Sequence, residues 1–91
     1  MGEVTLKEGD IVANYKRYGL YGRELQSEPN KYLYKIIGLA YNCTKELETM
    51  VVYQALYKPY MLCVRTVGDF CSILPQVGRY RFEKWNGEVA E

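Results

Sequence analysis

Residues 31–42 carry apolar side chains at both alternating sets of positions, with Gly38 in the interior of the run. A strand that has one face in water shows apolar residues at every second position only. Both faces of this strand therefore need cover, and a glycine inside a strand is typical of a strand that bends sharply. A strand that bends and is shared between two half-sheets meets both requirements.

The rest of the chain supplies further short strands and no convincing helix-period stretch. Residues 19–30 are predicted to form a loop with one helical turn near 23–26, and residues 67–70 a 3₁₀ turn. We predict an all-β fold, either a small SH3-like barrel or a strongly bent antiparallel sheet of five to six strands, with at most one short helical turn. The predicted strands besides 31–42 are 11–18, 49–57, 61–66, 73–74 and 80–85.

The chain has 91 residues, which is enough for one domain. We expect residues 1–91 to be a single domain with a core at about 11–85 and short flexible ends. The most apolar windows, 36–41 and 50–57, are far shorter than the roughly 20 residues that span a bilayer, so no membrane association is expected. The three cysteines show no zinc or redox spacing, and their odd number argues against a secreted disulfide scaffold. These features predict a reduced, cytoplasmic protein.

Histidine is absent from the sequence. This excludes Ser-His and Cys-His nucleophile pairs, a histidine general base and every metal site that needs histidine. Glu46 and Glu48 lie in a predicted turn and do not form an acid–base pair without a cleft that shifts one pKa. We therefore predict no catalysis, no cofactor and no metal. Cysteine-dependent activity at Cys63 or Cys71 is a remote alternative hypothesis. A nearby cation stabilises a thiolate, and Arg65 is the one cation near Cys63 in sequence.

Residues 47–57, LETMVVYQALY, resemble the pattern L-E-x-x-V-V-Y-x-A-L-Y of a bacterial family, domain of unknown function 1653 (DUF1653). Residues 62–65, LCVR, are similar to the family's L-W-V-R-P, and residues 81–82 to its terminal R-F. The resemblance covers about 11–85, with a longer loop at 19–30. Other positions that fit the pattern are Tyr15–Lys16, Tyr34, Ile37–Gly38, Ala40 and Phe70.

The resemblance implies a mostly β domain related to SH3-like small barrels, and it implies no activity. Three positions depart from the family pattern. Asn42 stands where the family tends to have histidine, Cys63 replaces its tryptophan, and Thr66 replaces its proline. These departures put in question any family function that rests on that histidine or tryptophan.

Basic and aromatic residues alternate at 15–18, 31–35 and 79–82. Nucleic-acid-binding proteins use such pairs, because cations meet phosphates while aromatic faces stack on bases. The formal net charge is only +1, however, and simple strand alternation also places aromatics inside and cations outside. Nucleic-acid binding is therefore the alternative reading.

The preferred reading is a non-catalytic interaction module that binds a protein partner or associates with itself. Ten tyrosines fit this reading, because tyrosine is enriched at interfaces. Val51, Tyr53, Ala55 and Tyr57 are expected on the buried face of their strand, whereas Met50, Val52 and Leu56 on the other face need cover from a loop or a second chain. In the next strand, Leu62 and Val64 are expected to point inward and Arg65 outward, either available to a ligand or paired with Glu48. The candidate binding residues are Tyr15, Lys16, Arg17, Tyr34, Glu48, Arg65 and Arg81.

Overall fold

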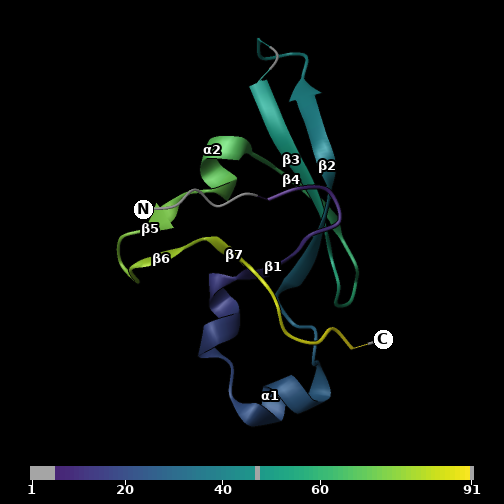
Figure 1. Ribbon diagram of the computed structural model, residues 1–91, viewed down its shortest axis with the longest axis vertical. Coiled ribbons are helices and arrows are strands. Elements are labelled where there is room, and N and C mark those ends of the chain that lie inside the picture. The colour runs from purple at the N-terminus through teal and green to yellow at the C-terminus, as the bar shows by residue number, and fades with distance from the viewer. Residues whose placement is uncertain (1–5, 47, 91) are drawn as a thin grey trace.

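The computed structural model describes residues 6–46 and 48–90. A five-stranded antiparallel sheet has the strand order β4-β3-β2-β1-β7, and β5 and β6 form a separate two-stranded sheet (Figure 1). The all-β prediction is confirmed, and among the described residues the larger sheet stays open, with β4 and β7 at its edges, instead of closing into a barrel. The strands are β1 (Ile11–Asn14), β2 (Leu33–Asn42), β3 (Glu48–Ala55), β4 (Leu62–Thr66), β5 (Ile73–Leu74), β6 (Arg79–Tyr80) and β7 (Phe82–Lys84).

Three short helical segments join these strands, where the sequence predicted at most one helical turn. They are η1 (Tyr15–Gly19), α1 (Gly22–Ser27) and α2 (Val67–Phe70). The prediction that residues 15–18 continue the first strand is wrong. The buried Asn14 side chain accepts a hydrogen bond from the Lys16 N–H at 3.1 Å, which caps η1 and ends β1. The helical turn predicted within residues 19–30 is present as α1.

A register shift between Ile36 and Gly38 interrupts the long β2–β3 hairpin. Ile36 lies opposite Tyr53 before the shift, and Leu39 lies opposite Val51 after it. The extra residue in β2 places Leu39 on the same face of the sheet as Ile36, although the two positions differ in parity. The bulge is the bend that the sequence predicted, but the predicted cover of both faces is wrong beyond it, since Leu39 and Tyr41 are 71% and 67% exposed.

The core lies on the face of the sheet that carries Tyr53, which we call the inner face. Figure 1 shows α2, β5 and β6 on this side of the β2–β3–β4 strands. The rings of Phe70 and Phe82 stack with centroids 4.3 Å apart, because α2 brings Phe70 onto the sheet. The buried residues of this cluster are Val12, Ile36, Val51, Tyr53, Phe70 and Phe82.

The ends of the predicted domain, residues 1–5 and 91, lie outside the described residues, as does Leu47, the first residue of the predicted family motif. Across the described ranges, no helix has the length and apolar character needed to cross a membrane.

Candidate functional site

Strand β4 presents its apolar side chains to solvent and its arginine to the core side. Arg65 lies opposite Val51 and Cys63 opposite Tyr53, so both share the inner face with these buried residues. Leu62 and Val64 lie on the opposite, outer face and are 65% and 55% exposed. The predicted orientation of β4 is therefore wrong. The predicted orientation followed from apolar character alone, whereas in the structure polar partners on α2 and β3 hold Arg65 on the inner face.

A polar cluster surrounds Arg65 on the inner face. Its Nη1 is ion-paired with Asp69 Oδ2 at 2.5 Å, and its Nε donates to Tyr53 Oη at 2.9 Å. Arg81 Nη2 lies 3.6 Å from Asp69 Oδ1, and Arg81 Nε donates to Ser72 Oγ at 3.3 Å. One carboxylate is thus shared by two guanidinium groups. We call Tyr53, Arg65, Asp69, Ser72 and Arg81 the arginine cluster.

Burial and hydrogen bonding act in opposite directions in this cluster. Burial raises the pKa of Tyr53 above its ordinary value, although the hydrogen bond from Arg65 and its charge pull in the other direction. Burial lowers the pKa of Arg65, but hydrogen bonds to Asp69 and Tyr53 outweigh this, so its pKa is raised. At neutral pH Tyr53 is therefore a neutral acceptor for a charged guanidinium.

The predicted ion pair between Arg65 and Glu48 is not formed. Glu48 lies opposite Asn42, and it shares its parity on β3 with outer-face residues, whereas Arg65 lies on the inner face. Asp69 is the ion-pair partner of Arg65 instead. The Thr66 side chain accepts a hydrogen bond from the Asp69 N–H and caps α2, which begins directly after β4. The following helical turn brings the Asp69 carboxylate back toward Arg65.

The predicted binding residues that lie on η1 make their side-chain contacts outside the arginine cluster. Arg17 donates to the carbonyl oxygens of Pro29 and Lys31, at 3.0 and 2.8 Å, and its guanidinium lies 4.5 Å from the centre of the Trp85 ring. Burial lowers the pKa of Arg17. Lys16 is exposed, and the Tyr15 N–H donates to the backbone carbonyl of Arg81 at 3.0 Å.

Tyr34 lies in the aromatic part of the core, next to the arginine cluster. Its hydroxyl shares a hydrogen bond of 2.5 Å with the Tyr57 hydroxyl, and its ring contacts those of Tyr53 and Phe82 edge-on. Burial and the hydrogen bond with Tyr57 raise the pKa of Tyr34. Of the seven predicted binding residues, Arg65 and Arg81 are brought together through Asp69. Tyr34 is separated from this pair by one aromatic ring.

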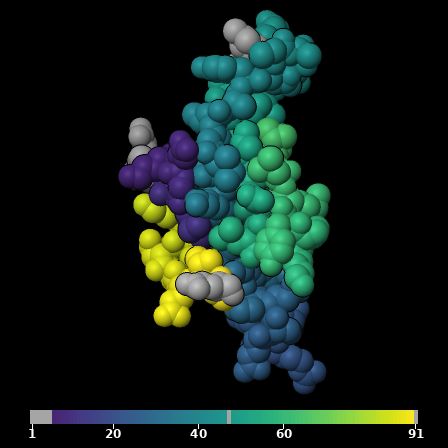
Figure 2. Space-filling view, turned by 90° about the vertical axis from the view of Figure 1, so that its right-hand side faces the viewer, coloured from purple at the N-terminus to yellow at the C-terminus, as the bar shows by residue number. Residues whose placement is uncertain are grey.

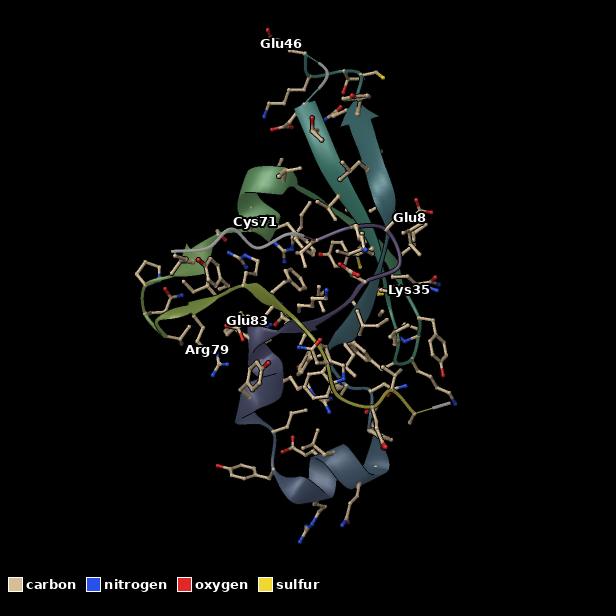
Figure 3. All side chains as sticks on the ribbon, in the orientation of Figure 1. Glu8, Lys35, Glu46, Cys71, Arg79 and Glu83 are labelled. Atoms are coloured by element: carbon tan, nitrogen blue, oxygen red, sulfur yellow. The ribbon has the colours of Figure 1, made fainter. Side chains whose placement is uncertain are left out.

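Most of the basic–aromatic pairs noted in the sequence are engaged within the molecule. Arg79 lies 3.8 Å from the centre of the Tyr18 ring, and its Nη2 is 3.1 Å from Glu83 Oε1 beside the β6–β7 connection (Figure 3). Lys31 Nζ lies 3.7 Å from Glu28 and 5.0 Å from the centre of the Tyr57 ring. Arginines and a lysine in all three segments thus contact aromatic rings, carboxylates or carbonyls of this chain.

The outer face of β3 and β4 carries an apolar surface that ends at the sheet edge. In register, Val52 lies opposite Val64 and Met50 opposite Thr66, while Leu62 follows on the same face. We call Met50, Val52, Leu62 and Val64 the outer patch. Figure 2 views this side of the molecule, with β4, in green, along the right-hand margin. The sequence indicated Met50 and Val52 as needing cover, but it missed Leu62 and Val64.

The backbone of β4 is open on the side away from β3. The Ala55 N–H donates to the Met61 carbonyl at 2.9 Å, so Met61 directs its polar groups toward β3. Because these directions alternate along a strand, Cys63 and Arg65 also pair with β3, whereas the N–H groups of Leu62, Val64 and Thr66 point outward. No described strand lies beyond β4.

The three cysteines are free thiols; Cys43 and Cys71 are exposed and Cys63 is half-buried. Within residues 6–46 and 48–90, no group of three or more His, Cys, Asp or Glu side chains is placed to hold a metal ion.

The fold and these two surfaces define a small antiparallel β domain with a polar cluster inside and an apolar patch at an open strand edge. The chain belongs to the family described as protein of unknown function DUF1653, whose family model matches residues 29–84. The match runs through the β2–β7 strands and both surfaces, and it begins later than the resemblance expected from residue 11. No curated protein and no solved structure matches the chain.

Proposed function

We propose that this domain is a non-catalytic interaction module that binds protein through the outer patch and the open edge of β4. The observation that carries the proposal is the combination of exposed Leu62 and Val64 with outward-pointing backbone groups on the same strand. Exposed edge strands accept an added strand by main-chain hydrogen bonds, while pockets or patches beside them select side chains. The three free thiols fit a reducing location, so the cytoplasm is part of the proposal.

The physical gain from such binding lies in the outer patch. Burying one large aliphatic side chain contributes about 1.5–3 kcal/mol relative to leaving it exposed. Leu62 and Val64 are both largely exposed here. Natural edge strands are commonly protected by charges, prolines or bulges, and β4 carries one charge, Arg65, which is turned to the inner face and paired.

The same contacts make nucleic acid a less favoured ligand. Arg17, Arg79 and Arg65 already contact a ring, a carboxylate or a carbonyl of this chain. Binding phosphate through them requires breaking those contacts. A titration with short single-stranded RNA and DNA, followed by amide NMR shifts at low and then physiological salt, distinguishes the readings. Localised shifts at residues 15–18 and 79–82 that fade with salt would favour nucleic acid.

The direct test is affinity capture from cell extract with three versions of the domain. Leu62→Lys combined with Val64→Lys places charge on the outer patch at exposed positions. Ile73→Lys combined with Val77→Lys adds the same charge at exposed apolar positions near β5, and it is the matched control. A protein retained by the wild type and the control, but lost from the β4 variant, supports the proposal. Identical retention by all three versions overturns it for partners other than this chain.

A further inference from the structure

We infer that the protein bound at the β4 edge is a second copy of this chain, paired antiparallel about a two-fold axis at Val64. This inference rests on the proposed function of that edge and names its partner. It follows from the register of β3 and β4, the side chains of β4 and the contrast with the other sheet edge.

The hydrogen-bond pattern of β4 suits self-pairing at this register. A two-fold axis at Val64 places Val64 opposite Val64 of the second copy, and Leu62 opposite Thr66. The outward-pointing N–H and C=O groups of Leu62, Val64 and Thr66 then lie where hydrogen bonds form between the two copies of β4. The Val64 N–H of each copy donates to the Val64 carbonyl of the other, and each Thr66 N–H donates to a Leu62 carbonyl. The Thr66 carbonyl begins α2 and is left out, so about four inter-chain bonds form.

The side chains at this register are mutually compatible. On the outer face, two Val64 side chains meet at the axis and join the two outer patches into one apolar surface. On the inner face, Arg65 lies opposite Cys63 of the second copy and not opposite another arginine. Its charge is already paired with Asp69. An isologous contact requires a self-complementary surface, and β4 provides one.

The opposite edge of the sheet lacks these properties. Strand β7 contains Glu83 and Lys84 within its three residues. A two-fold axis at Glu83 would place two glutamates directly opposite each other, which is destabilising. The charges of β7 are a protection that natural edge strands commonly carry, whereas the one charge of β4, Arg65, is turned to the inner face and paired with Asp69.

The size and charge of the domain permit this contact. A stable small interface buries about 600 Å² per copy. That is about a tenth of the accessible surface of 6460 Å² of this chain. The net charge of +1 gives little repulsion between copies. Since a single strand pair with a small patch is at the low end of this size class, we expect a reversible dimer.

The test is sedimentation velocity over about 10–500 µM protein, the range in which a small interface associates. Val64→Pro removes the outward N–H but no β3–β4 hydrogen bond, because Val64 directs its backbone away from β3. Val64→Thr keeps the N–H and the branched side chain and is the control. We expect the wild type and Val64→Thr to shift toward a dimer with concentration. Val64→Pro should associate at least about tenfold more weakly.

Cross-linking supplies a second measurement that does not depend on how well the proline variant folds. In a background with Cys43, Cys63 and Cys71 changed to serine, Val64→Cys is oxidised with oxidised glutathione, which is reduced as the disulfide forms. Hydrogen-bonded antiparallel pairs have Cα atoms about 5.5 Å apart, within the range that a disulfide bridges. Ile73→Cys is the control, since Ile73 is 56% exposed and Val64 55%. We expect the Val64 variant to cross-link at least about tenfold faster.

The outcomes separate this inference from the proposed function. A wild type that stays monomeric at every concentration, with equal cross-linking at both positions, overturns the second-copy inference. If capture from extract still depends on Leu62 and Val64, the interaction module stands with a different partner. If the protein stays monomeric and capture from extract does not depend on Leu62 and Val64, both proposals are overturned.

Discussion

The Arg65 guanidinium donates a hydrogen bond to the Tyr53 hydroxyl at 2.9 Å, between two adjacent strands on the inner face of the sheet. This contact joins the polar cluster to the aromatic core, since the Tyr53 ring also packs edge-on against Phe70 and Phe82. The hydroxyl accepts from the arginine while the ring remains in the core. A charged side chain is thereby held on the core side of an edge strand whose other face is apolar.

Removing the Tyr53 hydroxyl tests how much this hydrogen bond contributes. We expect Tyr53→Phe to lower the free energy of unfolding by about 1 kcal/mol, because Arg65 loses one acceptor but keeps Asp69 and partial access to water. The measurement is urea denaturation followed by circular dichroism. Tyr41→Phe, at a position 67% exposed, is the control and should leave the stability within about 0.5 kcal/mol of the wild type. A loss that is equal in both variants would contradict a specific role for the Tyr53 hydroxyl.

The shared carboxylate predicts a salt-dependent effect for Asp69→Asn. The amide keeps the size of the side chain but leaves Arg65 and Arg81 facing each other without a carboxylate. We expect the free energy of unfolding to fall by about 1 kcal/mol at low salt. The loss should be smaller in 1 M NaCl, where the Debye length is about 3 Å. Glu83→Gln, which breaks the single pair with Arg79, should cost no more than about 0.5 kcal/mol. A loss for Asp69→Asn that does not change with salt would indicate that the charge is not responsible.

Local signals in the sequence were sufficient to place the main strands and most turns. The apolar runs correspond to β2, β3 and β4, and the apolar residues of both parities with Gly38 predicted a bend at the place where the structure has the bulge. The glycine itself is not sterically required there, because a Cβ at Gly38 would have no neighbour within 4 Å. The bulge puts Ile36 before it and Leu39 after it on the same face, where Ile36 is buried and Leu39 is 71% exposed.

Residues far apart in the chain decide which side chains of β4 point to the inner face and which residues form the arginine cluster. Leu62 and Val64 are more apolar than Cys63 and Arg65, so β4 viewed alone predicts the opposite orientation. The actual orientation is favoured because Asp69 on α2 and Tyr53 on β3 accept hydrogen bonds from the Arg65 guanidinium, while Asp69 also pairs with Arg81 before β7. The sequence indicated Arg65 and Arg81 separately, but it contained no local signal that Asp69 joins them.

The position of Phe70 predicts that its truncation is severely destabilising although α2 has only four residues. Phe70 is 1% exposed, and its ring stacks on Phe82. We expect Phe70→Ala to lower the free energy of unfolding by about 3–5 kcal/mol through lost burial and a residual cavity. Val67→Ala, on the same helix but at an exposed position, should cost less than about 1 kcal/mol. The comparison uses urea midpoints at neutral pH, and similar losses in the two variants would contradict the stacked arrangement.

The half-buried hydroxyl pair of Tyr34 and Tyr57 predicts how stability changes at alkaline pH. Burial and the hydrogen bond raise the folded-state pKa of Tyr34 above the unfolded value of about 10. The stabilisation is therefore fully present below pH 10 and is lost as the pH rises through the folded-state pKa, because the unfolded chain releases this proton first.

The measurement for this last prediction compares the wild type with Tyr34→Phe at each pH from 8 to about 11, the range that crosses the unfolded tyrosine pKa. The wild type should be more stable at pH 8, where its hydroxyl pair is intact, by about 1 kcal/mol. Above pH 10 that advantage should shrink, because only the wild type contains a Tyr34 proton that unfolding releases. Titrating groups that do not contact Tyr34 affect both proteins alike and cancel in the difference. An advantage that grows with pH would show that the fold favours the ionised phenolate, and it would contradict a hydrogen bond that favours the neutral hydroxyl of Tyr34.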